Sequence, residues 1–177
     1  MDRLRSPSLL LDPLDREDYP WICALYADPE VMRFIGSGVR SEQQSRTNLD
    51  ALLAQAERLG FGYWMVRERE TAERVGGALL IVRREGTPVE LGFAFARAFW
   101  GKGFATEAAR ALVDHAFGDL RIPLLQAFTD VDNAASGAVL RKAGFRDAGL
   151  TAGPYGGTDR RFVLTREEWL AARPAGS

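Results

Sequence analysis

Two glycines one residue apart, Gly101 and Gly103, form the part of this chain most suited to binding a ligand. They lie in the turn W-G-K-G-F-A (100–105), between an apolar segment at 90–96 and an alanine-rich run that begins at Thr106. Glycine lets a ligand approach the backbone closely. The first amides of a helix lack internal partners and lie at the positive end of its dipole. The turn therefore predicts a phosphate-binding site at the start of a helix.

Other chemistries lack the residues that they require. His115 is the only histidine and Cys23 the only cysteine, so they cannot assemble a familiar zinc site, and we expect no metal. We interpret His115 as structural or solvent-facing and Cys23, beside apolar neighbours, as a core residue. The chain has no Gly-x-Ser-x-Gly elbow, and its glycine turn lacks the Lys-Ser/Thr ending of a nucleotide P-loop.

The glycine turn follows a series of apolar segments with short polar connections, which predicts an antiparallel meander. This order of strands disfavours a dinucleotide site, which would need an opening βαβ unit. A helix after the turn and another strand beyond it imply one parallel crossover. The predicted strands are 8–11, 61–67, 75–82, 90–96, 122–129, 145–150 and 160–164.

The helices are predicted from their end signals. Ser41 with Gln44 forms a capping box, and Gly60 is a stop signal. Asn133 is a cap, and Gly144 is a second stop signal. The main predicted helices are 19–27, 41–59, 106–117 and 134–142, and 165–169 closes the fold. Residues 30–35 form an apolar piece between the first two helices, and the tail 173–177 is expected to be loose.

The composition is that of an ordinary globular protein. A length of 177 residues predicts one domain over 1–177, and we place its core at 8–169. The net charge of −1 favours neither nucleic acid nor an anionic membrane as a partner. No run of about 18 apolar residues suggests a membrane span. The N-terminus does not resemble a secretory signal, and the single cysteine fits a reducing compartment, so we expect a cytoplasmic protein.

The glycine turn and a segment near the C-terminal third of the chain resemble a known family. W-G-K-G-F-A is similar to the pyrophosphate loop of the GNAT superfamily of N-acetyltransferases, and D-V-D-N-A-A-S-G-A-V-L-R-K-A-G-F (130–145) resembles its second signature. Trp100 stands where Arg or Gln is usual, as in the RimJ/RimL-like branch, and D-P-E-V-M-R-F (28–34) also resembles that branch. The resemblance covers about 8–169. It implies an α/β (α+β) GNAT fold: a mixed, mostly antiparallel sheet of six to seven strands with a central splayed parallel pair and about four helices.

The resemblance implies that acetyl-CoA is the co-substrate. The turn and first helical residues would bind its pyrophosphate through backbone amides. Lys102 either contacts phosphate or is simply solvated, and Asn133 is a helix cap, a pantetheine contact or both. The backbone of the strand before the turn would pair with the pantetheine arm like an added strand. The residues implied in cofactor binding are Phe93, Ala94, Phe95, Trp100, Gly101, Lys102, Gly103, Phe104, Ala105, Thr106, Asn133 and Ser136.

Direct attack of a primary amine on the thioester is the chemistry that the resemblance implies. The amine must lose a proton, because a lysine-like ammonium has a pKa of about 10.4. Glu90 is the candidate base, directly or through a water; the alternative is a solvated strand-edge charge or a structural ion pair. Many relatives place a tyrosine near the leaving sulfur, but Leu140 stands at that position. Ser136 is the candidate hydrogen-bond donor instead, or an ordinary first-turn residue, and Tyr155 is a less favoured donor.

We therefore predict an acetyl-CoA-dependent N-acetyltransferase, acting on a protein or peptide N-terminal amine. The alternative acceptor is a small-molecule amine or antibiotic. An alternative of another class is a CoA-binding module without catalysis. In the resembling family the first two helices and their joining loop border the acceptor, so specificity is expected between residues 32 and 46, unless Met32 and Phe34 only pack in the core. We expect a monomer or homodimer.

Overall fold

A computed structural model describes residues 1–153 and 156–173. Its sheet has eight strands in the order β1-β2-β3-β4-β5-β6-β8-β7, and every neighbouring pair is antiparallel except the parallel pair β5–β6. The strands are β1 (Leu4–Arg5), β2 (Leu9–Pro13), β3 (Tyr63–Glu68), β4 (Arg74–Ile81), β5 (Val89–Phe95), β6 (Leu124–Asp130), β7 (Arg146–Ala152) and β8 (Thr158–Thr165). The predicted α/β class and mixed sheet are confirmed. The strand number was underestimated by one, because the two residues of β1 are too few to show a pattern.

Six α-helices accompany the sheet in the described residues. They are α1 (Tyr19–Ala27), α2 (Pro29–Met32), α3 (Glu42–Leu59), α4 (Phe104–Asp114), α5 (Ala134–Lys142) and α6 (Arg166–Ala171). The capping box of Ser41 and Gln44 is present, and Gly60 ends α3 with a φ of 78°. The first half of the apolar piece at 30–35 belongs to the short helix α2, whose N-cap Asp28 accepts a hydrogen bond from the amide of Glu30. Sequence reasoning gave it no structure because four residues show no helical period.

The sheet carries a different hydrophobic cluster on each face. One joins β2, β5, β6 and β8 to α4, through residues such as Leu91, Leu112 and Phe162. The other joins α1 and α3 to β3 and to Ala94 of β5. The helices that begin at the glycine turn and at Asn133 thus lie on one face, and the N-terminal helices lie on the other.

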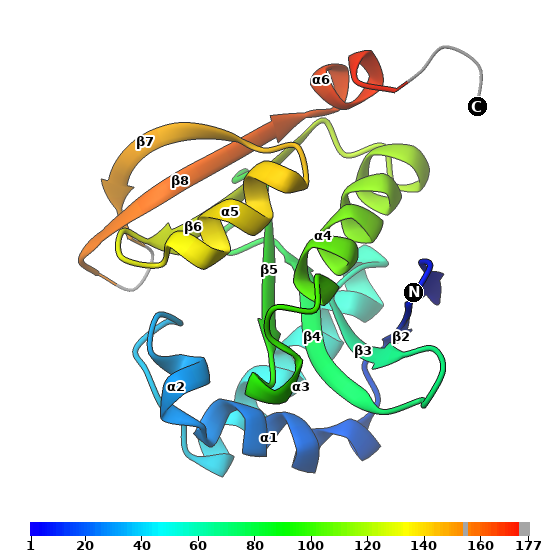
Figure 1. The fold of residues 1–177 in the computed structure, drawn as a ribbon, viewed down its shortest axis with the longest axis vertical. Helices are drawn as coiled ribbons and strands as arrows, with labels where there is room; N and C mark the ends of the chain where they lie inside the picture. Colours follow the sequence, from blue (N-terminus) through cyan, green and yellow to red (C-terminus); the bar gives the residue numbers. More distant parts are fainter. Residues whose placement is uncertain (154–155, 174–177) are drawn as a thin grey trace.

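The sheet opens at its centre. β5 and β6 pair only through Val89 with Leu125 and Glu90 with Gln126, although both strands continue for several residues beyond. Figure 1 shows the two halves diverging from β5, with β6, β8 and β7 toward the upper left and β4, β3 and β2 toward the lower right. The predicted splayed parallel pair is therefore confirmed.

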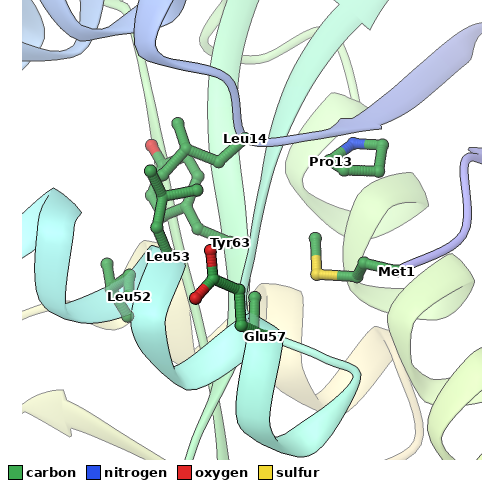
Figure 2. Close-up of a pocket in the computed structure, with 8 residues that line it drawn as sticks. Met1, Pro13, Leu14, Leu52, Leu53, Glu57 and Tyr63 are labelled. Atoms are coloured by element: carbon green, nitrogen blue, oxygen red, sulfur yellow. The ribbon is translucent and has the colours of Figure 1, made fainter.

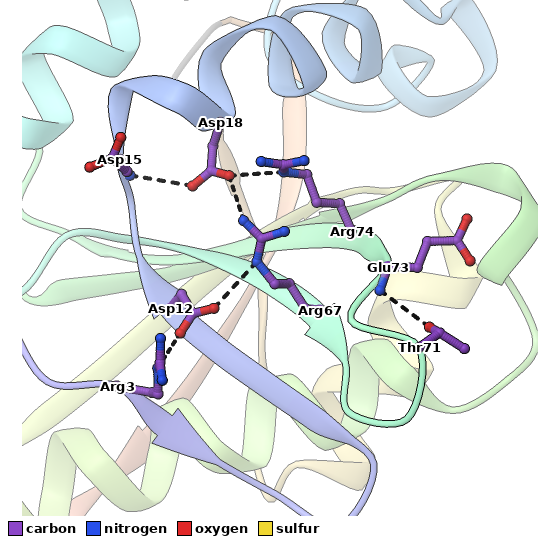
Figure 3. Close-up of polar contacts among 8 residues, drawn as sticks. All are labelled: Arg3, Asp12, Asp15, Asp18, Arg67, Thr71, Glu73 and Arg74. Carbon is purple, nitrogen blue, oxygen red and sulfur yellow. Dashed lines mark hydrogen bonds and ion pairs between the residues drawn. The ribbon is translucent and has the colours of Figure 1, made fainter.

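A buried carboxylate fixes the N-terminal segment to the sheet. Asp18, which is 3% exposed, accepts hydrogen bonds from Arg67 and Arg74 at 2.8 and 2.9 Å. Arg67 also pairs with Asp12 of β2, which in turn pairs with Arg3 (Figure 3). A buried charge is tolerated when it is paired and hydrogen-bonded, so this network holds β2 and the start of α1 against β3 and β4.

None of the helices in the described part of the chain has the length and apolar character needed to cross a membrane.

Candidate active site

The glycine turn has the backbone shape that its sequence predicts. Gly101 and Gly103 have φ values of 76° and 84°, in the left-handed region that favours glycine. A Cβ atom built on either residue would have no protein atom within 4 Å. Both glycines therefore border open space, where a ligand can reach the backbone. This open cradle is the observation that fits a pyrophosphate group.

The amides that follow the turn are available to a ligand. Gly103 is the N-cap of α4 and no side chain caps the helix there. The first amides of the helix therefore lack internal partners. Phe104 is buried and anchors the first turn, while Lys102 lies with its Nζ 4.9 Å from the centroid of the Phe99 ring. The helix begins two residues earlier than predicted, so Phe104 and Ala105 belong to it.

Trp100 has a clear structural role in place of the usual arginine or glutamine. Its indole Nε1 donates a hydrogen bond to the carbonyl of Phe95 at 2.7 Å, while the side chain remains 51% exposed. This bond ties the start of the turn to the end of β5. The turn and the strand edge are therefore held as one surface.

The open edge of β5 can pair with an extended ligand. The amide of Ala96 donates to Val75, so backbone alternation directs Ala94 toward β4 and directs Phe93 and Phe95 toward the opening. Since the Phe95 carbonyl is taken by Trp100, the groups left at this edge are both polar groups of Phe93 and the amide of Phe95. By this geometry the backbone of Ala94 is directed away from the opening, and its side chain packs in the cluster with α1 and α3.

Asn133 and Ser136 lie together at the start of α5. The side-chain oxygen of Asn133 accepts a hydrogen bond from the amide of Ser136 at 3.1 Å, which confirms Asn133 as the helix cap. No described residue takes a hydrogen bond with the Ser136 hydroxyl. Leu140, one turn later, is 1% exposed and belongs to the core. The hydroxyl of Ser136 thus has no hydrogen-bond partner among the described residues.

Glu90 is buried and held by an arginine. It is 6% exposed, and the guanidinium of Arg83 approaches its two carboxylate oxygens at 2.5 Å each. Arg83 follows β4 and reaches back across the hairpin to β5, and its side chain is 30% exposed. The ion pair foreseen as the alternative for Glu90 is therefore present.

The carboxylate of Asp159 was not predicted as a site residue from the sequence. Asp159 of β8 lies opposite Asp130 of β6, and Glu90 lies opposite Gln126 on the same strand β6. Burial raises the pKa of the Asp159 carboxyl, and the charges of Asp130 and Glu90 raise it further, while Arg83 lowers it. The only available signal was strand pairing between distant segments, which local patterns do not contain.

The remaining predicted residues have simple positions. Met32 is fully buried in the cluster with α1 and α3, so it packs in the core. His115 is 4% exposed, with its Nδ1 2.8 Å from Asp119 and its ring in a T-shaped arrangement with that of Trp64. Cys23 is buried, and burial raises the pKa of its thiol. Tyr155 and most of the tail, residues 174–177, lie outside the described residues.

Two hollows lie elsewhere on the surface. The first lies between β2 and α3, and none of the residues around it is a predicted site residue (Figure 2). The second is bordered by Trp21, Asp28 and Ala96, where α1 meets the end of β5. Only the second adjoins the strand that ends at the glycine turn.

Comparison with known proteins gives a consistent result. The family model for the acetyltransferase (GNAT) domain matches residues 8–146. An uncharacterised N-acetyltransferase, p20 of Bacillus licheniformis, is 29% identical over 85% of this chain and 85% of its own length. The FsC-acetyl coenzyme A-N(2)-transacetylase of Aspergillus fumigatus is 30% identical over 94% of this chain and 77% of its own length.

Solved structures share the fold. An acetyltransferase from Agrobacterium tumefaciens is 27% identical, with a TM-score of 0.82 over 93% of this chain and 94% of its own. Two structures below 20% identity share the fold alone. RimL, a ribosomal L7/L12 alpha-N-protein acetyltransferase in complex with coenzyme A, has a TM-score of 0.79 over 93% of this chain and 98% of its own. AAC(6')-Ib, in complex with paromomycin and acetyl-CoA, has a TM-score of 0.80 over 96% of this chain and 99% of its own.

Proposed function

This chain belongs to the GNAT acetyltransferase family, and on that premise we propose that it transfers an acetyl group from acetyl-CoA to a primary amine. The observation that carries the proposal is the continuous open surface formed by the glycine turn and the β5 edge. A phosphate cradle at a helix start adjoins a strand edge of free polar groups. A ligand with a diphosphate followed by an extended amide-bearing arm suits both parts.

The binding roles follow from this surface. The amides of Gly101 to Thr106 would hold the pyrophosphate, with Lys102 beside them. Phe93 and Phe95 would pair with the arm through their backbone, and Trp100 would brace that edge. Asn133 would hold the turn that carries Ser136. We also infer that residues 1–177 act as one acetyltransferase domain with its core at 8–169, because one sheet runs through them.

The catalytic roles are assigned by position. Bound acetyl-CoA supplies an activated acetyl thioester. Ser136 would donate a hydrogen bond toward the leaving sulfur, because its hydroxyl is free of described partners at the head of α5. Glu90 lies where the two halves of the sheet separate and is the base proposed from the sequence. To act so, its carboxylate would have to keep an oxygen available to the amine in competition with Arg83.

We propose a protein or peptide N-terminal amine as the acceptor, and a RimJ/RimL-like branch for the chain. The support is W-G-K-G-F-A with its leading Trp100, together with D-P-E-V-M-R-F. A small amine or antibiotic is the second candidate, since AAC(6')-Ib has the same fold with an aminoglycoside bound. A CoA-binding module without catalysis is the third candidate function.

Release of free thiol from acetyl-CoA, measured over an amine panel, tests the proposal. The panel should contain a hexapeptide with a free amino terminus, spermidine, ribostamycin and benzylamine. We expect amine-dependent release that is fastest with the hexapeptide. Release only with ribostamycin or spermidine would move the acceptor to small amines. Binding of acetyl-CoA without release on any amine would favour the module.

A further inference from the structure

Asp159 of β8 has a carboxylate that no described cation engages, one strand beyond the opening between β5 and β6. We propose that Asp159, rather than Glu90, accepts the proton of the incoming ammonium. This inference rests on the proposed function, because it names the base of the same reaction.

Strand register places Asp159 on the face of the sheet opposite to α4, from which we expect the acceptor amine to enter. Glu90 is opposite Gln126, and Asp130, four residues along β6, is opposite Asp159. Directly paired residues point to the same face, and so do alternate residues of one strand. Glu90, Gln126, Asp130 and Asp159 therefore share one face, opposite to the face that packs against α4.

This face is left open beside β5. The cluster formed with α1 and α3 reaches Ala94 of β5 but includes no residue of β6 or β8. The described helices therefore cover β3, β4 and part of β5 and stop at the opening. An amine that enters from this side can meet a thioester held along the β5 edge, because the opening between β5 and β6 joins the two faces.

The two candidate carboxylates differ in their partners. Arg83 holds both oxygens of Glu90, and a base must offer an oxygen to the ammonium. Asp159 accepts no hydrogen bond and makes no ion pair with the described residues, and its carboxylate lies against Gly153, where an added Cβ would come within 2.6 Å of its Oδ2. The Asp130 carboxylate already accepts a bond from the amide of Asp132 at 2.8 Å. Asp159 is thus the carboxylate of this group with neither oxygen engaged by a described residue, whereas one oxygen of Asp130 is engaged.

The surrounding charges support a proton-accepting role. The groups around Asp159 are Asp130 from β6, Glu90 from β5 and Arg83 after β4, with Arg161 two residues along β8. Burial raises the pKa of the Asp159 carboxyl, Asp130 and Glu90 add to this, and Arg83 opposes it. A carboxylate with a raised pKa is a stronger base.

The step balances with the substrates alone. Asp159 takes one proton from the ammonium, and the neutral nitrogen forms a bond to the acetyl carbon. The carbon–sulfur bond breaks, and the thiolate takes the second proton of the nitrogen. Asp159 then releases its proton to water.

The test is the pH dependence of kcat/KM for thiol release, with the best amine of the panel named above, in the wild type, Asp159→Asn and Glu90→Gln. Asp2→Asn is the control, an exposed carboxylate whose side chain has no described partner. We expect Asp159→Asn to lose about 100-fold near neutral pH and to recover as the free amine becomes abundant at high pH. Glu90→Gln should show no such pH-dependent loss, and the affinity for acetyl-CoA should stay unchanged in Asp159→Asn.

Gly153→Ala gives a second variant that keeps the charge of Asp159, because its Cβ would displace the Asp159 carboxylate and would also lie 2.9 Å from the carbonyl oxygen of Gly156. We expect lower kcat with the pH dependence retained. A wild type that releases no thiol with any amine would overturn the proposed function and this inference together. Two results with an active wild type would overturn the role of Asp159 alone. In the first, kcat/KM of Asp159→Asn depends on pH as in the wild type. In the second, Glu90→Gln shows the pH-dependent loss and Asp159→Asn does not.

Discussion

Gly103 shows how one residue can join backbone shape to ligand binding. Its positive φ and the open space around it would let a phosphate reach the first amides of α4, as the proposed site requires. Gly86, in the turn between β4 and β5, has nearly the same geometry, with a φ of 78° and open space around it. Gly86 lies outside the proposed site. Substitutions at Gly103 and Gly86 should therefore cause similar backbone strain, and only those at Gly103 should affect ligand binding.

Gly103→Glu should therefore weaken acetyl-CoA binding at least about tenfold, since it places bulk and negative charge where the pyrophosphate would lie. Gly86→Glu should carry similar strain and leave the affinity unchanged. Isothermal titration of acetyl-CoA into both variants measures the difference. Equal affinities in the two variants would remove the glycine turn from the binding site.

Asp159 links the proposed chemistry to stability. Its pKa in the folded state is raised, so the folded protein holds this proton more tightly than the unfolded chain does. The associated stability is present below the unfolded pKa and is lost as the pH rises through the folded pKa. Asp159→Asn should therefore be more stable than the wild type at neutral pH, and the gain should vanish at about pH 3, where the acid is protonated in both states.

Asp147→Asn is the matched control of opposite sign. The amide of Gly149 lowers the pKa of Asp147, and Arg160 and Arg141 lower it further, against the effect of burial. Its charge should stabilise the fold above the unfolded pKa, so its removal should destabilise the protein at neutral pH. Urea denaturation at several pH values measures both variants. If the free energy of unfolding depended on pH in the same way in Asp159→Asn and Asp147→Asn, the opposite pKa shifts assigned to the two carboxyls would be contradicted.

The elements β5 and α4 act as a unit because Trp100 connects them. Its indole bond to Phe95 fixes the distance between the strand edge and the helix start. Trp169 offers a comparison, because its Nε1 also donates a bond at 2.8 Å, to Asp114 at the end of α4 away from the glycine turn.

Trp100→Phe should thus weaken acetyl-CoA binding several-fold, with a loss of about 1 kcal/mol expected for one hydrogen bond. Trp169→Phe should lose a comparable bond and retain the affinity. Calorimetric titration of both variants tests this, and an unchanged affinity in Trp100→Phe would show that the indole is not needed to shape the site.

The elements were predictable to the extent that their signals are local. Ser41 with Gln44, Gly60 and Asn133 mark helix ends through contacts within a few residues, and all three are confirmed. The helix α2 and the strand β1 were missed because they are shorter than one pattern repeat. The start of α4 was placed two residues late, since a glycine N-cap gives no side-chain signal.

At the scale of the whole molecule, the sequence indicated the fold through a family resemblance and left the site incomplete. The partnership of Arg83 with Glu90 and the position of Asp159 depend on register between β4, β5, β6 and β8. Such register is a property of the assembled sheet. The same holds for the short β5–β6 pairing, which creates the opening where cofactor and acceptor would meet.

The central claim is that this opening and the glycine turn bind acetyl-CoA. Calorimetric titration of acetyl-CoA into the purified wild-type protein, with dephospho-CoA as a comparison, tests it most directly. We predict one site with a Kd in the micromolar range, on the order of the substrate constants usual for enzymes. A folded protein that takes up neither compound would contradict the account.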